Sequence, residues 1–412
     1  MTTNHAGSSV TTDSPAPRQR QHITIVSETF APEINGVANT LKHLCRGLMQ
    51  RGHRVTLVRP QPAGEQSDRL PASLCTDELR TRGLPLPGYS GLQFGLIRPA
   101  RLLRLWQEQR PDAIYVATQG PLGVAAVRAA KKLGIPVCSG FHTNFHQYSS
   151  YYGLGTLRWL LCRYGRWFHN QTRLTLVPTR KMQHTVRQMG IDNARLWSRG
   201  VDCQTFTPHK RNASLREHWG VAGNELAVIY VGRLAAEKNV KLAVACFERI
   251  RCLHPRARFI LVGDGPLRES LQARHPDYVF CGSQQGDELA RHYASADLFL
   301  FPSKTDTFGN VVLEAMASGL GVVAFDDAAA AEHIRQDENG QKAPLTDDEA
   351  FILNALRLAD QPSLLSRMRT RARLDALDLT WTSQVELFEQ LVLNQPEQGP
   401  YHATDEQSVS IF

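Results

Sequence analysis

The chain of 412 residues is 42% hydrophobic and 21% charged and has a net charge of +8, which is ordinary for a globular protein of two or three domains. It lacks the run of roughly eighteen apolar residues that a membrane span requires. Its eight cysteines have neither the spacing of a zinc site nor that of a disulfide framework. We therefore exclude a transmembrane or disulfide-stabilised protein and expect reduced thiols in the cytoplasm.

The charge is divided unevenly along the chain. Residues 1–205 carry 26 Lys and Arg against 11 Asp and Glu, whereas the remainder carries 21 against 28. The first part is therefore at +15 and the second at −7. A basic half indicates an anionic surface or substrate, although a solvated basic face would give the same counts.

The first half alternates between two patterns after a polar start. Residues 1–21 are rich in Ser, Thr and Pro without an apolar segment, which predicts a disordered arm. The predicted strands are 22–27, 54–58, 113–117, 136–140 and 174–178, and the predicted helices are 37–51, 99–109, 120–133 and 180–189. This alternation predicts a parallel sheet with helices on both faces.

A second alternating series begins near residue 225. Its predicted strands are 226–231, 258–262, 278–281, 298–301 and 322–325, and its predicted helices are 240–253, 266–273, 288–295, 309–318 and 328–335. We expect an α/β fold of two Rossmann-like doubly wound domains, 22–200 and 225–378, facing each other across a cleft. The expected remaining parts are a linker at 201–224, a last helix at 381–393 and a flexible tail at 394–412.

The most informative motif spans 301–319, where a strand ends, a polar loop follows and a helix begins. Asp306 lies in the loop, and Glu314 lies less than two turns into an otherwise apolar helix, where a carboxylate needs a polar partner. Backbone N–H groups at the helix start can bind a phosphate or a hydroxyl. These groups belong to Phe308, Gly309 and Asn310. A helix cap or a solvated glutamate explains either carboxylate alone, but together they suit a polyhydroxylated ligand.

This segment resembles the Glu-x7-Glu motif of retaining GT-B glycosyltransferases, the glycosyl transferases group 1 or family four. The resemblance spans about 22–393. It implies that Asp306 and the amides after it hold the donor sugar ring, that Glu314 binds the ribose, and that the helix 381–393 returns to the first domain. The expected activity is transfer of a hexose from a UDP- or GDP-linked sugar to an acceptor hydroxyl.

Two cations follow the first strand of the second domain. Arg233 can bind a pyrophosphate through two parallel N–H groups of its guanidinium, and Lys238 can bind it as a point charge. Two cations in a surface loop are, however, usually only solvated. The resemblance implies that they clamp the donor diphosphate and stabilise the departing nucleotide. It also places Gly263 beside the nucleotide, and Gly282 ends a strand whose backbone groups can meet the base.

In the first domain, Gly36 opens a helix and His142 follows the strand 136–140. An ordinary turn glycine has the same pattern as Gly36. The resemblance implies that Gly36 lets donor phosphate or acceptor come close and that His142 faces the reacting sugar. No Asp-x-Asp occurs, so no metal or other cofactor is expected, and the leaving phosphate is implied to assist deprotonation of the acceptor.

The acceptor is indicated by a predicted helix at 157–173. Its apolar side contains Leu157, Leu160, Leu161, Tyr164, Trp167 and Phe168, and its polar side contains Arg158, Arg163, Arg166, His169 and Arg173. The pattern is typical of an interfacial helix on anionic lipid, and equally of a core-packed helix with a solvated face. Because the chain resembles bacterial lipid-directed mannosyl-, glucosyl- and sulfoquinovosyl-transferases, we expect a lipid acceptor and peripheral contact with the inner face of the cell membrane.

Three alternatives remain open. A nucleotide-sugar epimerase shares the architecture and needs no acceptor, but the Asp306–Glu314 motif argues against it. A non-catalytic sugar-nucleotide-binding protein would not need Arg233, Lys238, Glu314 and His142 together. Nucleic-acid binding is disfavoured because no recognition motif occurs and the positive charge is one-sided.

Overall fold

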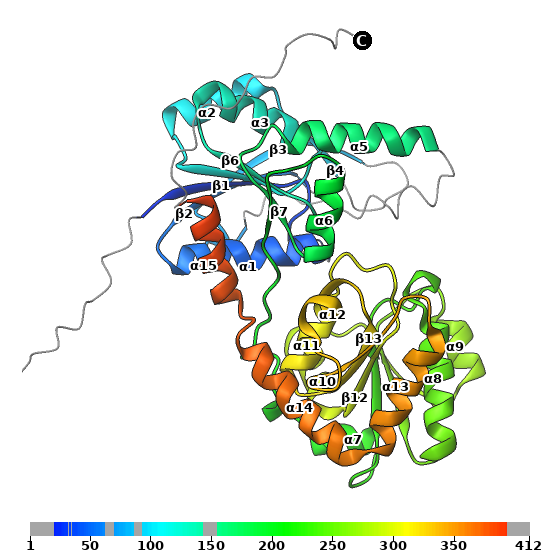
Figure 1. Cartoon of the computed structure of the whole chain (residues 1–412). Helices are drawn as coiled ribbons and strands as arrows, with labels where there is room; N and C mark the ends of the chain where they lie inside the picture. The colour runs from blue at the N-terminus through cyan, green and yellow to red at the C-terminus, as the bar shows by residue number, and fades with distance from the viewer. Residues whose placement is uncertain are drawn as a thin grey trace, which may run out of the picture.

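A computed structural model describes residues 20–31, 33, 35–61, 70–85, 93–142 and 155–393. The predicted tail, and all of the predicted arm except its last two residues, lie outside this range. The chain forms two α/β units, one above the other in Figure 1. No helix in the described part of the chain is long and apolar enough to cross a membrane.

The first unit contains an eight-stranded sheet in the order β4-β3-β2-β1-β5-β6-β7-β8. Its strands are β1 (His22–Val26), β2 (Arg54–Pro60), β3 (Asp77–Pro85), β4 (Gln93–Leu96), β5 (Ala113–Val116), β6 (Val137–Gly140), β7 (Thr175–Val177) and β8 (Ala194–Leu196). Every pair of neighbours is parallel except β3 and β4. The sequence pattern missed β3, β4 and β8. β4 and β8 are short strands at the two edges of the sheet, and β3, which lies beside β4, is largely half-exposed. None of the three has the continuous apolar run of a buried parallel strand.

The helices of the first unit cover both faces of this sheet. They are α1 (Gly36–Gln50), α2 (Pro99–Glu108), α3 (Pro121–Leu133), α5 (Gly155–His169) and α6 (Arg180–Gln188). On one face, Leu41 of α1 packs on Ile23 and Ile25 of β1. On the other face, α2 and α3 bury Trp106 and Ala126. The burial of these apolar side chains holds the helices on the sheet.

The second unit contains a six-stranded parallel sheet in the order β11-β10-β9-β12-β13-β14. Its strands are β9 (Ala227–Val231), β10 (Arg258–Val262), β11 (Val279–Gly282), β12 (Leu298–Phe301), β13 (Gly321–Phe325) and β14 (Gln341–Ala343). Its helices are η1 (Pro208–Lys210), α7 (Ala213–His218), η2 (Ala236–Lys238), α8 (Val240–Leu253), α9 (Arg268–Arg274), α10 (Gly286–Ser295), α11 (Asn310–Ala317), α12 (Ala328–His333), α13 (Asp348–Asp360) and α14 (Pro362–Leu377). Counted from β9, the order is 3-2-1-4-5-6, the doubly wound arrangement whose ligands bind where the order reverses. That reversal lies between β9 and β12.

The chain passes between the two units twice, and the two passages lie side by side. The Val201 N–H donates to the Leu379 carbonyl at 2.8 Å, and Val201 pairs with Thr380. The chain then enters α15 (Trp381–Val392), which lies beside α1 in Figure 1. There Val385 and Phe388 are buried in the core of the first unit. The last helix therefore packs on the sheet formed by the start of the chain.

The carboxyl ends of the two sheets also meet. Lys181 of α6, which follows β7, forms an ion pair with Asp327, which follows β13, at 2.6 Å. Close by, the hydroxyl of Ser198 lies 3.3 Å from a ring nitrogen of His333. The edges at which parallel sheets bind ligands thus face each other.

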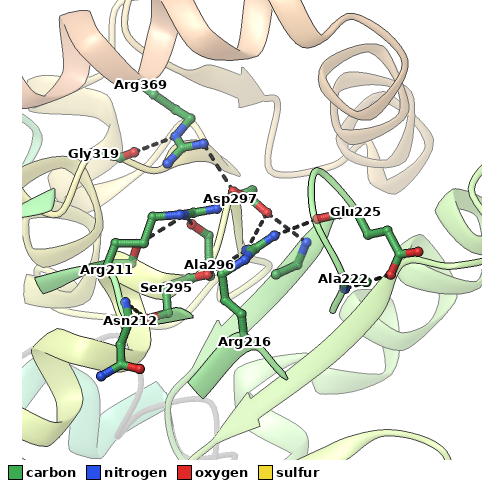
Figure 2. Close-up of polar contacts among 12 residues, drawn as sticks. Arg211, Asn212, Arg216, Ala222, Glu225, Ser295, Ala296, Asp297, Gly319 and Arg369 are labelled. Carbon is green, nitrogen blue, oxygen red and sulfur yellow. Dashed lines mark hydrogen bonds and ion pairs between the residues drawn. The ribbon is translucent and has the colours of Figure 1, made fainter. Parts of the chain in front are cut away.

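A buried carboxylate, that of Asp297, which directly precedes β12, holds part of the segment 201–224 against the second sheet (Figure 2). Arg211 and Arg369 contact its Oδ1 at 2.8 and 3.1 Å, and Arg216 contacts its Oδ2 at 3.0 Å. The Ala227 N–H donates to Oδ2 at 2.9 Å. Burial alone would raise the pKa of Asp297, but the arginines and this N–H outweigh burial and hold it below its ordinary value.

Replacing Asp297 with asparagine should destabilise the protein strongly, because Arg216 would remain buried without a counter-charge. Breaking a buried ion pair costs about 3–5 kcal/mol. Urea unfolding at pH 7 measures this loss, and the difference should shrink as the pH falls through the depressed pKa of Asp297. The exposed Asp287, which also contacts two cations, serves as the control. Equal effects of Asp297→Asn and Asp287→Asn would contradict the anchoring role.

Candidate functional site

Two loops meet at the point where the order of the second sheet reverses. One follows β9 and contains η2, and the other follows β12 and leads to α11. The Asn239 side chain donates to the Pro302 carbonyl at 3.3 Å, and the Thr305 hydroxyl donates to the Glu237 carbonyl at 3.0 Å. These bonds bring the predicted cations and the predicted acidic loop together.

The predicted donor-binding residues form one ion pair across these loops. Lys238 Nζ lies 2.7 Å from Asp306 Oδ1, and both side chains are about three-quarters buried. Arg233 is instead 65% exposed and contacts Glu237 at 3.2 Å. Such exposed pairs contribute little to stability, so Arg233 is available to an incoming anion.

The start of α11 is polar and incompletely satisfied. Gly309 precedes the helix with φ 81°, a left-handed conformation that favours glycine, and no side chain caps this helix. Three buried polar atoms nearby have no hydrogen-bond partner within the described chain, namely Ser303 Oγ, Asp306 Oδ2 and Asn310 Oδ1. Because buried polar atoms in native proteins are nearly always paired, this cluster indicates a site for a polar ligand.

Three other predicted residues shape the surrounding loops. Phe308 is buried, and its carbonyl accepts the Ala329 N–H at 2.7 Å. Gly263 has φ 141°, and a Cβ there would lie 1.9 Å from the Gly232 carbonyl oxygen, so only glycine fits. Its N–H donates to the carbonyl of Gly282 at 2.8 Å. These contacts hold the loops after β9, β10 and β11 against one another.

Glu314 is the fifth of the eight residues of α11 and has one polar partner. The Tyr293 hydroxyl donates to its Oε2 at 3.2 Å, and no cation pairs with it in the described structure. Burial raises the pKa of Glu314 to about 7, against the smaller opposite effect of the Tyr293 hydrogen bond. A carboxylate in this position has unused capacity for hydroxyl donors.

Gly36 is the first residue of α1 and comes after the loop that follows β1. The helix is capped by Asn35, whose side chain accepts the N–H groups of Val37 and Ala38 at 3.1 and 2.9 Å. A Cβ added at Gly36 would meet no atom within 4 Å. Packing therefore gives no reason for glycine at this position, and its Cα faces open space.

His142 follows β6 and is almost fully buried. Its Nε2 lies 2.7 Å from the Tyr115 hydroxyl, and its Nδ1 lies 3.1 Å from Arg199 Nη2. Burial, Arg199 and His169 hold its pKa well below the ordinary histidine value. No hydrogen bond or ion pair between described residues joins His142 or Gly36 to the loops of the second unit.

Sequence reasoning missed three of these polar partners, Tyr115, Arg199 and Tyr293. Each is far from its partner along the chain, and none belongs to a recognised motif. Only the topology, which places the ends of β5, β6 and β8 together, brings the first two to His142. A buried cation in an aperiodic segment has no signal in a single sequence.

The helix predicted at 157–173 is α5, which ends at His169. Three large apolar side chains on it are exposed: Trp159 by 60%, Leu160 by 53% and Trp167 by 42%. Arg163 lies 5.5 Å from the centre of the Trp159 ring. The apolar side is therefore only partly packed into the core.

Two residues of the predicted polar side are placed differently, so this part of the prediction was wrong. His169 is fully buried, with its Nδ1 2.8 Å from the Ser139 hydroxyl. Arg173 lies beyond the helix and donates to the Val392 carbonyl of α15 at 2.8 Å. Helical period assigns a face to each residue but does not show which face the sheet covers.

Comparison with known proteins gives matches along most of the chain. The family models described as Glycosyltransferase Family 4 and Glycosyl transferases group 1 match residues 34–205 and 225–361. The chain is 32% identical over 370 residues to a GDP-mannose-dependent alpha-mannosyltransferase of Mycobacterium tuberculosis, covering 87% of this chain and 93% of that protein. It is 24% identical over 371 residues to an alpha-monoglucosyldiacylglycerol synthase of Acholeplasma laidlawii, covering 85% and 92%. The fold resembles that of sucrose-phosphate synthase from Thermosynechococcus elongatus, with a TM-score of 0.73, 18% identity and coverage of 90% and 98%.

The raised pKa of Glu314 makes a prediction about stability. Because the folded state disfavours ionisation of this carboxyl group, its contribution to stability is lost as the pH rises from about 4.5 to about 7. Glu314→Gln should therefore raise the melting temperature relative to the wild type more at pH 8 than at pH 5. At pH 8 we expect the free energy of unfolding of Glu314→Gln to exceed that of the wild type by about 1–3 kcal/mol. A difference that does not change with pH, as expected for the exposed control Glu288→Gln, would contradict this assignment.

Proposed function

The chain belongs to glycosyltransferase family 4 and is a glycosyltransferase with a nucleotide-sugar donor; from this premise we propose that it is a retaining enzyme that moves a hexose from a UDP- or GDP-sugar to a hydroxyl of a membrane lipid. The observation that carries the proposed donor site is the group of unpaired polar atoms in the loop after β12, next to Lys238. A diphosphate sugar supplies both the anions and the hydroxyl groups that this loop lacks.

The proposed binding mode exchanges one set of contacts for another. In this mode Lys238 leaves Asp306 and binds the β-phosphate of the donor, and Arg233 leaves Glu237 and binds the same diphosphate. The released carboxylate of Asp306 and the free amides at the start of α11 then accept and donate hydrogen bonds to the sugar ring. The two cations also stabilise the charge that develops on the departing nucleotide.

Glu314 is proposed to hold the ribose of the same donor. Its carboxylate has one protein partner, Tyr293, and the two ribose hydroxyls would be its remaining donors. Because an ionised carboxylate accepts both hydroxyls, donor affinity should improve as the pH rises through about 7. The name of the mycobacterial relative makes GDP-mannose the first donor to test.

The lipid acceptor is supported by a relative whose name includes diacylglycerol and by the surface around α5. Its exposed tryptophans flank arginines, as in helices that lie in the membrane interface. A groove of about 420 Å³ runs beside it between α2, α3 and α5. The groove is lined by Pro99, Val124, Val127, Arg128, Lys131, Lys132, Trp167, Phe168 and Gln171. An apolar floor with a cationic rim suits an anionic lipid surface, which the protein would contact peripherally.

A panel of GDP- and UDP-sugars incubated with membrane lipid tests the function, with products identified by mass. We expect one donor to give a lipid heavier by one hexose. Lys238→Ala and Glu314→Ala should each abolish transfer, because they remove a diphosphate and a ribose contact, whereas Lys241→Ala on α8 should not.

Near-normal transfer by Lys238→Ala or Glu314→Ala would overturn the role of that residue. Conversion of the nucleotide sugar in the absence of any acceptor would favour the epimerase alternative. Binding of nucleotide sugar without any product would favour a non-catalytic protein.

Membrane contact is tested by sedimentation with liposomes of anionic or zwitterionic lipid at low and high salt. We expect binding to anionic liposomes at low salt and its loss at high salt, because surface charges are screened. Replacing Trp159 and Trp167 with serine should weaken binding at least tenfold. Leu353→Ser, a change at an exposed apolar residue of α13, is the control. If the wild-type protein does not sediment with anionic liposomes at low salt, the proposal of membrane contact is wrong.

A further inference from the structure

Arg199 is a buried cation just before the passage between the two units. Arg199 is only 3% exposed, and its Nη1 has no hydrogen-bond partner in the described structure. No carboxylate of the described residues forms an ion pair with it. Burial lowers the pKa of Arg199 to about 10, so it stays charged at neutral pH. An uncompensated buried charge is costly, which indicates that Arg199 has a function.

The contact between Arg199 and His142 fixes where the imidazole carries its proton. A guanidinium group only donates hydrogen bonds, so Nδ1 of His142, 3.1 Å from Arg199 Nη2, must be an unprotonated acceptor. The proton of the neutral ring is then on Nε2, which donates to the Tyr115 oxygen at 2.7 Å. A doubly protonated ring would place an N–H group against the cation.

The surroundings hold this arrangement rigidly. The Tyr115 ring is fully buried and lies edge-on against Trp197 and Phe388, with centroids 5.9 and 5.2 Å away. A Cβ at Gly140 would lie 2.2 Å from the Tyr115 hydroxyl and 2.4 Å from His142 Nε2, so a larger residue would displace both. The Tyr115 ring therefore cannot move away from His142 without disturbing the core of the first unit.

The other titratable groups near His142 do not compete for its nitrogens. His169 is the second histidine that acts on it, and burial lowers the pKa of His169 to about 3, so it is neutral. Its own ring nitrogens contact the Ser139 hydroxyl and the Gln119 side chain. Among the described residues, Tyr115 is the other titratable group that contacts His142, and burial raises its pKa above the ordinary range.

We propose that Arg199 is a positioning residue that holds His142 as a neutral imidazole with its proton on Nε2. The catalytic part of this proposal rests on the proposed function, whereas the tautomer does not. With Nδ1 bound to Arg199 and Nε2 bound to Tyr115, His142 has no lone pair for the acceptor's proton.

Nuclear magnetic resonance of protein labelled with ¹⁵N-histidine tests the tautomer directly. We expect His142, assigned by loss of its signals in His142→Gln, to show an unprotonated Nδ1 and a protonated Nε2 without change from pH 5.5 to 8. In Arg199→Met no donor faces Nδ1, so both neutral tautomers should be populated and the shifts of the two ring nitrogens should move towards each other. Arg199→Lys, which keeps a charged donor, should restore the wild-type spectrum.

Transfer kinetics give a second readout. Arg199→Met should lower kcat at least tenfold at both pH 8 and pH 5.5, because His142 loses its fixed tautomer, while KM for the donor changes less than twofold; Arg199→Lys should restore kcat. Arg173→Met removes another partly buried arginine of the same unit and should reduce stability without changing kcat or KM.

Titration of His142 near pH 6.5 in the wild type, or a protonated Nδ1, would overturn the proposal even if no Arg199 variant folds. An unchanged spectrum in Arg199→Met would do the same. Because the resonance experiment needs no substrate, a fixed tautomer in a protein without transferase activity would count against the proposed function alone.

Discussion

The candidate donor site depends on the reversal of strand order between β9 and β12. The chain leaves these neighbouring parallel strands in opposite directions, and the loops that follow cannot close over the gap between them. The gap fixes where Lys238 and Asp306 meet and where the free end of α11 points. The carboxyl ends of the strands in the first sheet face the carboxyl ends of the strands in the second sheet. Gly36 and His142 follow β1 and β6 at that edge of the first sheet.

Buried charges in this protein are of two kinds. The carboxylate of Asp297 has three arginines and a backbone N–H around it, so its burial is compensated and it anchors the structure (Figure 2). Asp306, Glu314 and Arg199 each have buried or partly buried charge with an incomplete set of partners. Incomplete compensation lowers stability unless a ligand completes the set. This difference separates the anchoring charge of Asp297 from Asp306 and Glu314, which are proposed to bind the donor, and from Arg199, which is proposed to position His142.

Much of the fold was predictable because buried parallel strands have continuous apolar runs, as in β9, β10 and β12. The edge strand β4 and its neighbour β3 were missed because most of their residues are partly exposed. The helix α14 was also missed, since arginines interrupt its apolar positions. Of the candidate site, the residues within local motifs, such as Asp306 and Lys238, could be found from sequence. Arg199 could not, because 57 positions separate it from His142.

Hydrogen–deuterium exchange with and without a nucleoside diphosphate measures the central claim most directly. The proposed donor site requires GDP or UDP to slow exchange in two segments, 232–239 and 302–314, since both loops would bind the ligand. Exchange in α2, which belongs to the first unit and packs on α3, should be unchanged. Protection of other segments only, or none at saturating nucleotide, would contradict a donor site between β9 and β12.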